Sequence, residues 1–305
     1  MLENIVIVGT QVLVLFVLIG VGFVCNKVKV LTRGSVKDLT NLVLYVVSPC
    51  VIINSYMREF DKAMLGGLLI TLAVAFCSFG LNILVANLLI KDKDKAREKT
   101  LRFGTIFSNC GYMSLPLQNA LLGDEGVFYG ATFIVVFQIV VWTYGVLLMS
   151  GDVKNVSLKR IVCTPGIIGT AIGLVIFVFS LSVPKVIAQP IQYLAALNTP
   201  IPMIVVGFHL AGARLYIKGL SAYLSVALRL VILPMTLLWG LYILGIRGVV
   251  LISCVIAASA PSAANTTMFS EKFGADTPLS ATMVSLTTLL SVITMPVVVG
   301  IASSI

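Results

Sequence analysis

Charged residues are scarce in this chain of 305 residues. Lys, Arg, Asp and Glu make up 11% of it and hydrophobic residues 59%, whereas globular proteins have roughly 25% charged residues. This balance excludes a soluble globular domain. The chain has one histidine and no CxxC pair among its six cysteines, so we expect no metal centre and no cofactor. Since no nucleophile, base and orienting residue can be assembled, we also expect no enzyme.

Long apolar runs take up most of the chain. A bilayer core about 30 Å thick requires about 20 apolar residues per helix, and ten runs are candidates: 5–25, 38–57, 64–90, 101–122, 126–150, 161–182, 190–213, 219–245, 249–273 and 277–302. The first run lacks the preceding basic residue of a signal peptide, so we expect it to be retained as a helix. The sequence therefore predicts an all-α integral membrane protein in the cytoplasmic membrane.

Basic residues predict the orientation of these runs, because cytoplasmic connections are rich in Lys and Arg. The connections after the odd-numbered runs hold 16 of the 21 basic residues: Lys27, Lys29, Arg33, Lys37, Lys91, Lys93, Lys95, Arg97, Lys99, Arg102, Lys154, Lys159, Arg160, Arg214, Lys218 and Lys272. These connections should be cytoplasmic and both termini outside. The net charge of +9 is then mostly this asymmetry, and no nucleic-acid partner is expected.

Acidic residues are absent from the deep parts of all ten runs. Carboxylate-based proton coupling, which is common in membrane pumps, therefore has no evident residue. Two modes of transport remain open. One is uncoupled anion movement down its gradient, and the other is coupling to sodium through hydroxyl, amide and backbone oxygens near 262–267.

Two of the runs are interrupted by polar and helix-breaking residues. Run 101–122 contains Asn109, Gly111, Tyr112, Pro116, Gln118 and Asn119, and run 249–273 contains Pro261, Ser262, Asn265, Thr266 and Thr267. Hydrocarbon cannot hydrogen-bond the freed backbone groups, so these must face protein or a solvated cavity. Interrupted helices in matching positions of two halves indicate a transporter's binding site.

The number of apolar runs on each side of the central loop and the positions of prolines indicate an internal repeat. Five runs precede the loop at 151–160 and five follow it, and an odd number of crossings inverts the second half. The second and seventh runs share mid-helix prolines, at Pro49 and at Pro200 and Pro202. We therefore predict a first five-helix repeat over 1–150, a cytoplasmic connection over 151–160 and a second, inverted repeat over 161–305.

These motifs resemble one family. The stretch 107–117 (FSNCGYMSLPL) with 123–126 (GDEG) is similar to the fourth-helix signature of the auxin efflux carrier family in its short prokaryotic form. The stretch 260–265 (APSAAN) with 273–276 (FGAD) is similar to the ninth-helix signature of its bacterial members. Arg229 with Pro234, and Thr287 with Pro296, also fall where that family has them.

The resemblance implies a fold and a class of substrate. The fold would have ten transmembrane helices in two inverted five-helix repeats, as in bile-acid/sodium symporters, with broken crossover helices 4 and 9. Helices 1, 2, 6 and 7 would form a scaffold, through which a homodimer is plausible, and the rest a transport domain. Substrates in the family are organic anions: auxin for the plant PIN-type carriers, malate or malonate for bacterial permeases.

The crossing of the two broken helices is the predicted binding site. Helix N-termini carry partial positive charge and unpaired N–H groups, which favour a carboxylate. We expect Asn109 and Asn265 to donate their amides to it, with Ser262 and Thr266 assisting. The alternative is that these amides only satisfy the broken backbone. Gly111, Pro116 and Pro261 would form the crossover, with the two prolines keeping the half-helices apart.

Three further polar side chains are candidates to face the substrate. Gln138 and Ser48 match positions that face the pocket in the family, and each could instead bond a neighbouring helix. Tyr112 could line an apolar wall or simply pack.

Arg229 is the deepest charge. Insertion of an arginine at mid-bilayer costs about 2.5–3.5 kcal/mol, so such residues usually face a partner or a cavity. No deep acidic residue is available as that partner. Arg229 is therefore expected to bond the negative C-terminal end of a half-helix, or else to attract the anion.

The resulting hypothesis is a secondary transporter of a small organic anion that works by alternating access. Alternatives are a sodium-coupled organic-anion symporter, a membrane-embedded ligand sensor and a channel. A sensor would be marked by an attached cytoplasmic domain, and a channel by a continuous polar path. The sequence does not decide between malate, malonate and indole-like acids, or between import and export.

Overall fold

The computed structural model describes residues 2–157, 159, 162–212 and 217–305, and over these ranges the regular structure is helical, apart from one isolated β-bridge. Two basic residues assigned to the cytoplasm, Arg160 and Arg214, lie outside the described residues. Seven helical spans are long and apolar enough to cross a membrane, and two shorter apolar helices accompany them. The prediction of an all-α multi-pass membrane protein is confirmed.

The helices follow one another in this order, with π-helical turns marked η and one 3-10 turn, η4. The first half contains α1 (Leu2–Lys27), α2 (Arg33–Leu42), η1 (Val43–Val47), α3 (Ser48–Tyr56), α4 (Lys62–Leu89), α5 (Lys95–Ile106), η2 (Cys110–Ser114), α6 (Leu115–Val140), η3 (Val141–Gly145) and α7 (Val146–Ser150). The second half contains η4 (Val153–Asn155), α9 (Pro165–Val178), α10 (Lys185–Ala196), α11 (Pro200–Leu210), α12 (Leu220–Ala227), η5 (Leu228–Ile232), α13 (Leu233–Ile243), α14 (Gly248–Ser259), α15 (Asn265–Phe273) and α16 (Thr277–Ala302).

Prolines shape three of the membrane helices. Since proline lacks an N–H and clashes with the preceding turn, a helix that contains it must loosen there. The π-turns η1 and η5 end just before Pro49 and Pro234, so each widened turn absorbs its proline. Pro200 instead starts α11, after the short interruption that follows α10.

Gly123 separates the fourth and fifth predicted runs. From Cys110 to Ser150 the helical path continues without a loop. It is kinked at Gly123, whose φ of 64° and ψ of −155° are not helical. Because glycine has no Cβ, it adopts this conformation without a steric penalty. The change of direction therefore needs no connecting loop.

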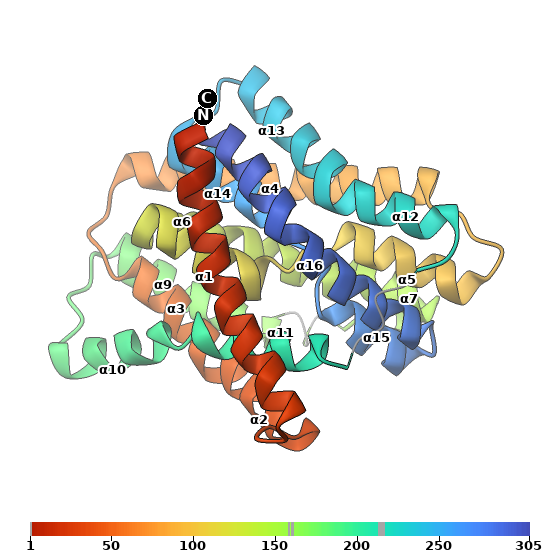
Figure 1. Ribbon diagram of the computed structural model, residues 1–305. Helices are drawn as coiled ribbons and strands as arrows, with labels where there is room; N and C mark the ends of the chain where they lie inside the picture. Colours follow the sequence, from red (N-terminus) through yellow and green to blue (C-terminus); the bar gives the residue numbers. More distant parts are fainter. Residues whose placement is uncertain (1, 158, 160–161, 213–216) are drawn as a thin grey trace.

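The two ends of the chain lie together. Figure 1 shows the N- and C-termini at the same end of the molecule, with α1 in front, beside α16 and across α11. Val8 and Val12 of α1 share an apolar cluster with Met295 and Val299 of α16. At the crossing with α11 the backbones touch, because a Cβ on Gly207 would lie 1.9 Å from the carbonyl oxygen of Ile19.

The largest buried apolar cluster lies around the first helix break. Phe107 is in ring contact with Phe79, Phe103 and Phe137, at centroid separations of 6.0, 4.4 and 5.8 Å. Aromatic pairs at such separations add about 0.5–1.5 kcal/mol each beyond the area they bury. This cluster fixes the position at which α5 ends.

Candidate functional site

Two helices are interrupted, and the two interruptions are paired with each other. Residues 107–109 separate α5 from η2, and residues 260–264 separate α14 from α15. Ser108 and Ser262 form an isolated antiparallel bridge. The Asn109 N–H donates to the Pro261 carbonyl at 2.7 Å, and the Ala263 N–H donates to the Phe107 carbonyl at 2.9 Å. Each break thus satisfies backbone groups that the other exposes, as burial in hydrocarbon requires.

The crossing brings two helix N-termini to the same bridge. Asn109 precedes η2 and its Oδ1 accepts the Tyr112 N–H at 3.4 Å, while Asn265 begins α15. Among the described residues, no hydrogen-bond partner is found for the Asn265 side chain or for the buried Thr266 hydroxyl. These amides and hydroxyls have donor capacity beside two positive helix ends.

Arg229 lies at the C-terminal ends of α5 and α14, the half-helices that precede the two breaks. It is fully buried on η5. Its Nη1 donates to the carbonyls of Thr105 and Ile106 at 3.1 and 3.2 Å, and its Nη2 donates to the Ala258 carbonyl. These carbonyls are the last of α5 and α14, so a single guanidinium bonds two helix C-termini. Its Nε has no partner among the described residues.

Both the hydroxyl and the N–H group of Ser262 are hydrogen-bonded. Its hydroxyl donates to the Gly104 carbonyl at 2.8 Å, and its N–H donates to Thr287 Oγ1 at 3.1 Å. Thr287 in turn donates to the Met283 carbonyl within α16. Ser262 therefore joins the second break to α5 and α16, a role that the sequence alone did not indicate.

The predicted crossover residues are not equivalent. Pro261 lies in the second break and accepts the hydrogen bond of Asn109. Pro116 instead lies in the first turn of α6, directly after η2, so the loosened π-turn accommodates its missing N–H, and the first break precedes both. Gly111 lies in η2, and a Cβ added there would meet nothing within 4 Å, so there is open space beside the break.

Gln138 and Pro49, the neighbour of Ser48, approach the same face of α9. A Cβ on Gly166 would lie 4.0 Å from Nε2 of Gln138, and one on Gly169 would lie 3.0 Å from Cα of Pro49, next to Ser48. Gln138, Ser48 and Tyr112 are all half-buried, and none of their own side chains makes a hydrogen bond to another described residue. Their polar groups remain available.

Sequence reasoning missed two buried amides that support the crossing. Asn82 of α4 donates to the Ile106 carbonyl at 3.3 Å, and Gln118 of α6 donates to the Ser253 carbonyl at 2.9 Å. A Cβ on Gly130 would lie 1.9 Å from Oε1 of Gln118. The signal for Gln118 was an amide in an apolar run, but the glycine that makes room for it is 12 positions further along the chain.

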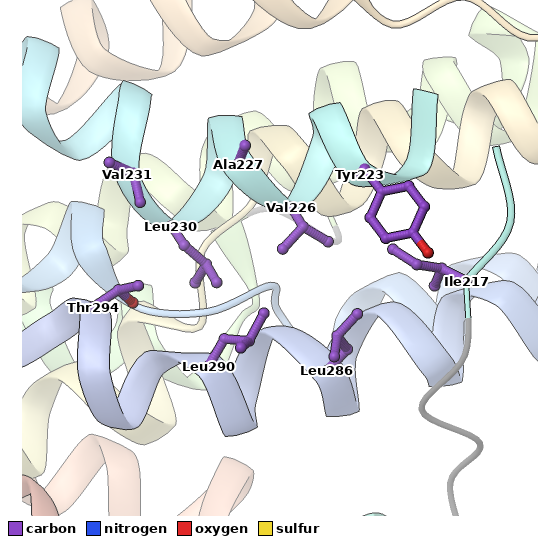
Figure 2. Close-up of a pocket in the computed structure, with 9 residues that line it drawn as sticks. All are labelled: Ile217, Tyr223, Val226, Ala227, Leu230, Val231, Leu286, Leu290 and Thr294. Carbon is purple, nitrogen blue, oxygen red and sulfur yellow. The ribbon is translucent and has the colours of Figure 1, made fainter. Parts of the chain in front are cut away.

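A pocket of about 400 Å³ lies between α12, η5 and α16. Figure 2 shows its lining: Ile217, Tyr223, Val226, Ala227, Leu230, Val231, Leu286, Leu290 and Thr294. Tyr223, Val231 and Leu290 are exposed, so the pocket opens on the outer surface of the helices. Among the described residues its lining is apolar apart from the hydroxyls of Tyr223 and Thr294.

The side-chain oxygens considered for sodium near 262–267 differ in their hydrogen bonding. Hard cations require several oxygen ligands. The Ser262 hydroxyl is engaged with Gly104, whereas the Thr266 hydroxyl is buried and free among the described residues. The Asn265 side chain is also without a partner there, so sodium binding near 262–267 stays a prediction.

At the predicted cytoplasmic end, ion pairs connect several helices. Arg97 of α5 approaches Asp92 at 3.5 Å and Asp276 at 3.7 Å, and it donates to the Lys218 carbonyl at 2.9 Å. Glu98 pairs with Lys95 at 2.9 Å and with Arg102 at 2.7 Å. Burial raises the pKa of Glu98, but these partners and the Asp92 N–H outweigh it, so the pKa lies below its usual value.

Comparisons with known proteins give one consistent result. The chain matches the family described as "Membrane transport protein" over residues 7–156 and 151–299. It is 26% identical over 294 residues to an uncharacterized transporter of Methanothermobacter thermautotrophicus, covering 93% of this chain and 95% of that protein. It is 24% identical over 295 residues to an uncharacterized transporter of Methanocaldococcus jannaschii, covering 92% and 94%.

Proposed function

Since the chain belongs to the membrane transport protein family that includes the auxin efflux carriers, we propose that it moves a small organic anion across the cytoplasmic membrane by alternating access. The family and the relatives are transporters, so the activity is transport and not catalysis. The observation that carries the anion proposal is the crossing itself, where one cation bonds two helix C-termini and leaves two N-termini to a ligand.

The proposed binding groups are those beside the N-termini. Asn109 and Asn265 donate amide N–H groups to a carboxylate, and the free Thr266 hydroxyl adds a third donor. Ser262 holds the break in place, and it would reach substrate only after releasing Gly104. Gln138, Ser48 and Tyr112, whose side chains are half-buried, would contact the body of the substrate.

The proposed architecture has ten membrane helices in two inverted repeats, 1–150 and 161–305, joined by 151–160. Three features favour it: the paired breaks, the prolines at Pro49 and Pro200 in the second and seventh helices, and the neighbouring chain ends in Figure 1. Helices 1, 2, 6 and 7 would form the scaffold and a homodimer contact. Both termini would lie outside, with the ion pairs around Arg97 in the cytoplasm.

The test is flux through purified protein in liposomes. Radiolabelled malate, malonate and indole-acetate are offered with and without a sodium gradient and an imposed potential. We expect saturable flux of at least one anion, without a requirement for sodium. Absence of flux for all carboxylates by folded protein would reject the proposal. Binding without flux, seen as thermal stabilisation by an anion, would favour the sensor instead.

A further inference from the structure

The pocket between α12, η5 and α16 opens on a surface of exposed apolar side chains. Leu220 of α12, Ile232 of η5 and Ile293 of α16 are all exposed beside its lining. On helices that span a membrane, such side chains contact lipid hydrocarbon. Figure 2 shows aliphatic side chains of α12 and η5 directed toward those of α16 across the pocket. The pocket is therefore a groove that opens to the hydrocarbon of the bilayer.

The dimensions of this groove suit one lipid chain. Along α12 and η5 the lining extends from Tyr223 to Val231, and eight residues correspond to about 12 Å of helix. Because the hydrocarbon core is about 30 Å thick, the groove fits within one leaflet. Its volume of about 400 Å³ is that of a ligand pocket. Side chains that face a void lose dispersion contacts, and a hydrocarbon chain restores them.

Exposed lysines lie where the groove begins. The Ser221 hydroxyl donates to the Lys91 carbonyl at 2.6 Å, which holds the connection before α5 against the first turn of α12. Lys218 comes just before α12, and its carbonyl accepts a hydrogen bond from Arg97 at 2.9 Å. The side chains of Lys91 and Lys218 are both exposed. Tyr223 adds a hydroxyl to the lining one turn further in.

The backbone and the ion pairs at this end favour an anion as well. The N-cap of α12, Gly219, has no side chain, and the N–H groups of Leu220 and Ser221 have no acceptor among the described residues. Helix N-termini of this kind attract phosphate groups. The carboxylates of Asp92 and Asp276 approach Arg97, and no ion pair of the described residues includes Lys91. The groove thus combines an apolar interior with a positively charged end.

We propose that this groove binds an anionic phospholipid of the leaflet next to the connections assigned to the cytoplasm. One acyl chain lies between α12–η5 and α16, and the headgroup phosphate lies beside Lys91, Lys218 and the N-terminus of α12. Basic residues at this depth attract anionic headgroups. The occupant follows from the two halves of the site, because only a lipid supplies both a hydrocarbon chain and a phosphate at the membrane surface.

The lipid site is separate from the crossing of the broken helices, but it lies behind two of its supports. Leu230 of the lining follows Arg229, whose guanidinium bonds the ends of α5 and α14. Leu286 precedes Thr287, which accepts the N–H of Ser262. A chain in the groove therefore packs against the outer side of both η5 and α16, and it stabilises the fold.

The first experiment compares lipid headgroups on the intact purified protein in detergent. Bound dioleoyl phosphatidylglycerol and dioleoyl phosphatidylcholine are measured by native mass spectrometry. We expect phosphatidylglycerol to bind at least fivefold more tightly, because one basic residue near an anionic lipid corresponds to about fivefold, or about 1 kcal/mol. The double variant Lys91→Gln with Lys218→Gln should bring the two lipids within twofold. Lys154→Gln, an exposed lysine of η4, is the control and should keep the preference.

The second experiment fills the groove. Leu290→Trp should weaken phosphatidylglycerol binding at least fivefold, whereas Ile293→Trp, on the same helix but outside the lining, should change it less than twofold. Ala227→Leu fills the groove from the opposite wall and serves if the first variant unfolds at a lower temperature than the control.

Three results would overturn the proposal. Equal binding of the two phospholipids by the unaltered protein would mean that the headgroup is not recognised. Equal affinities of both filled variants and the Ile293→Trp control would place the lipid elsewhere. Oleate that binds as tightly as phosphatidylglycerol would make the occupant a fatty acid and not a phospholipid.

Discussion

Replacement of Arg229 by Gln tests how much the bonds of its guanidinium to the ends of α5 and α14 stabilise the fold. The guanidinium makes three hydrogen bonds to backbone carbonyls in a fully buried position. Hydrogen bonds of charged groups contribute about 1.5–3 kcal/mol each. The gain is reduced by the cost of burying the charge, and the Ile106 carbonyl keeps its bond from Asn82. Removing one member of such a buried group costs about 3–5 kcal/mol.

The assay is thermal unfolding of purified protein in detergent. One kcal/mol shifts the midpoint by about 2 °C for chains above 150 residues, so Arg229→Gln should lower it by about 6–10 °C. Arg247→Gln is the matched control, because Arg247 also donates to two carbonyls, those of Tyr242 and Ile246, but is exposed. It should shift the midpoint by less than 2 °C. Equal shifts for the two variants would refute the reasoning.

Four further predictions concern packing, charge, the site and orientation. Gly207→Ala places a Cβ 1.9 Å from the Ile19 carbonyl oxygen and should lower the stability measured by thermal unfolding by about 1–3 kcal/mol. The control Gly240→Ala, whose Cβ meets nothing within 4 Å, should be neutral or stabilising, and a larger loss of stability for Gly240→Ala than for Gly207→Ala would contradict the contact. The lowered pKa of Glu98 contributes stability that is present above its unfolded pKa and lost as the pH falls through the folded value. Glu98→Gln should therefore flatten the dependence of stability on pH below about pH 5, and an unchanged dependence would show that Glu98 makes no such contribution. Thr266→Val should leave the unfolding midpoint within about 1 °C but reduce carboxylate flux severalfold, and intact flux would exclude the hydroxyl from binding. Cys163, exposed at the start of the sixth predicted run, should react with an impermeant maleimide in inside-out vesicles only, whereas the buried Cys110 and Cys254 should not react. Labelling of Cys163 in right-side-out vesicles would reverse the proposed orientation.

The membrane helices were predictable because their signals are local. Apolar length marked the spans, and clusters of polar residues with glycine and proline marked the two interruptions near their observed places. Prolines likewise marked loosened turns, although the sequence did not reveal that Pro49 and Pro234 would be accommodated by π-turns. The continuous path from Cys110 to Ser150 was missed, because a glycine kink and a loop look alike in sequence.

The interior of the site was less predictable, because tertiary contacts decide it. The register that pairs Ser108 with Ser262 depends on residues more than 150 positions apart. Arg229 had two open roles in the sequence, and its bonds to the ends of α5 and α14 are those of a helix-end contact. Ser262 was grouped with the binding residues by its place in a motif, yet its hydroxyl is engaged with Gly104. In this structure the Ser262 hydroxyl hydrogen-bonds a backbone carbonyl and not a ligand.

The most direct test of the central claim, that the crossing binds the transported anion, is carboxylate flux in liposomes for three asparagine variants. Asn109→Ala and Asn265→Ala remove the amides beside the two helix N-termini, and Asn119→Ala removes an exposed amide from the same helix as Pro116. With protein amount and folding matched, we predict that the first two lose flux at least tenfold and that the third keeps it. Equal flux in all three would show that the anion binds elsewhere.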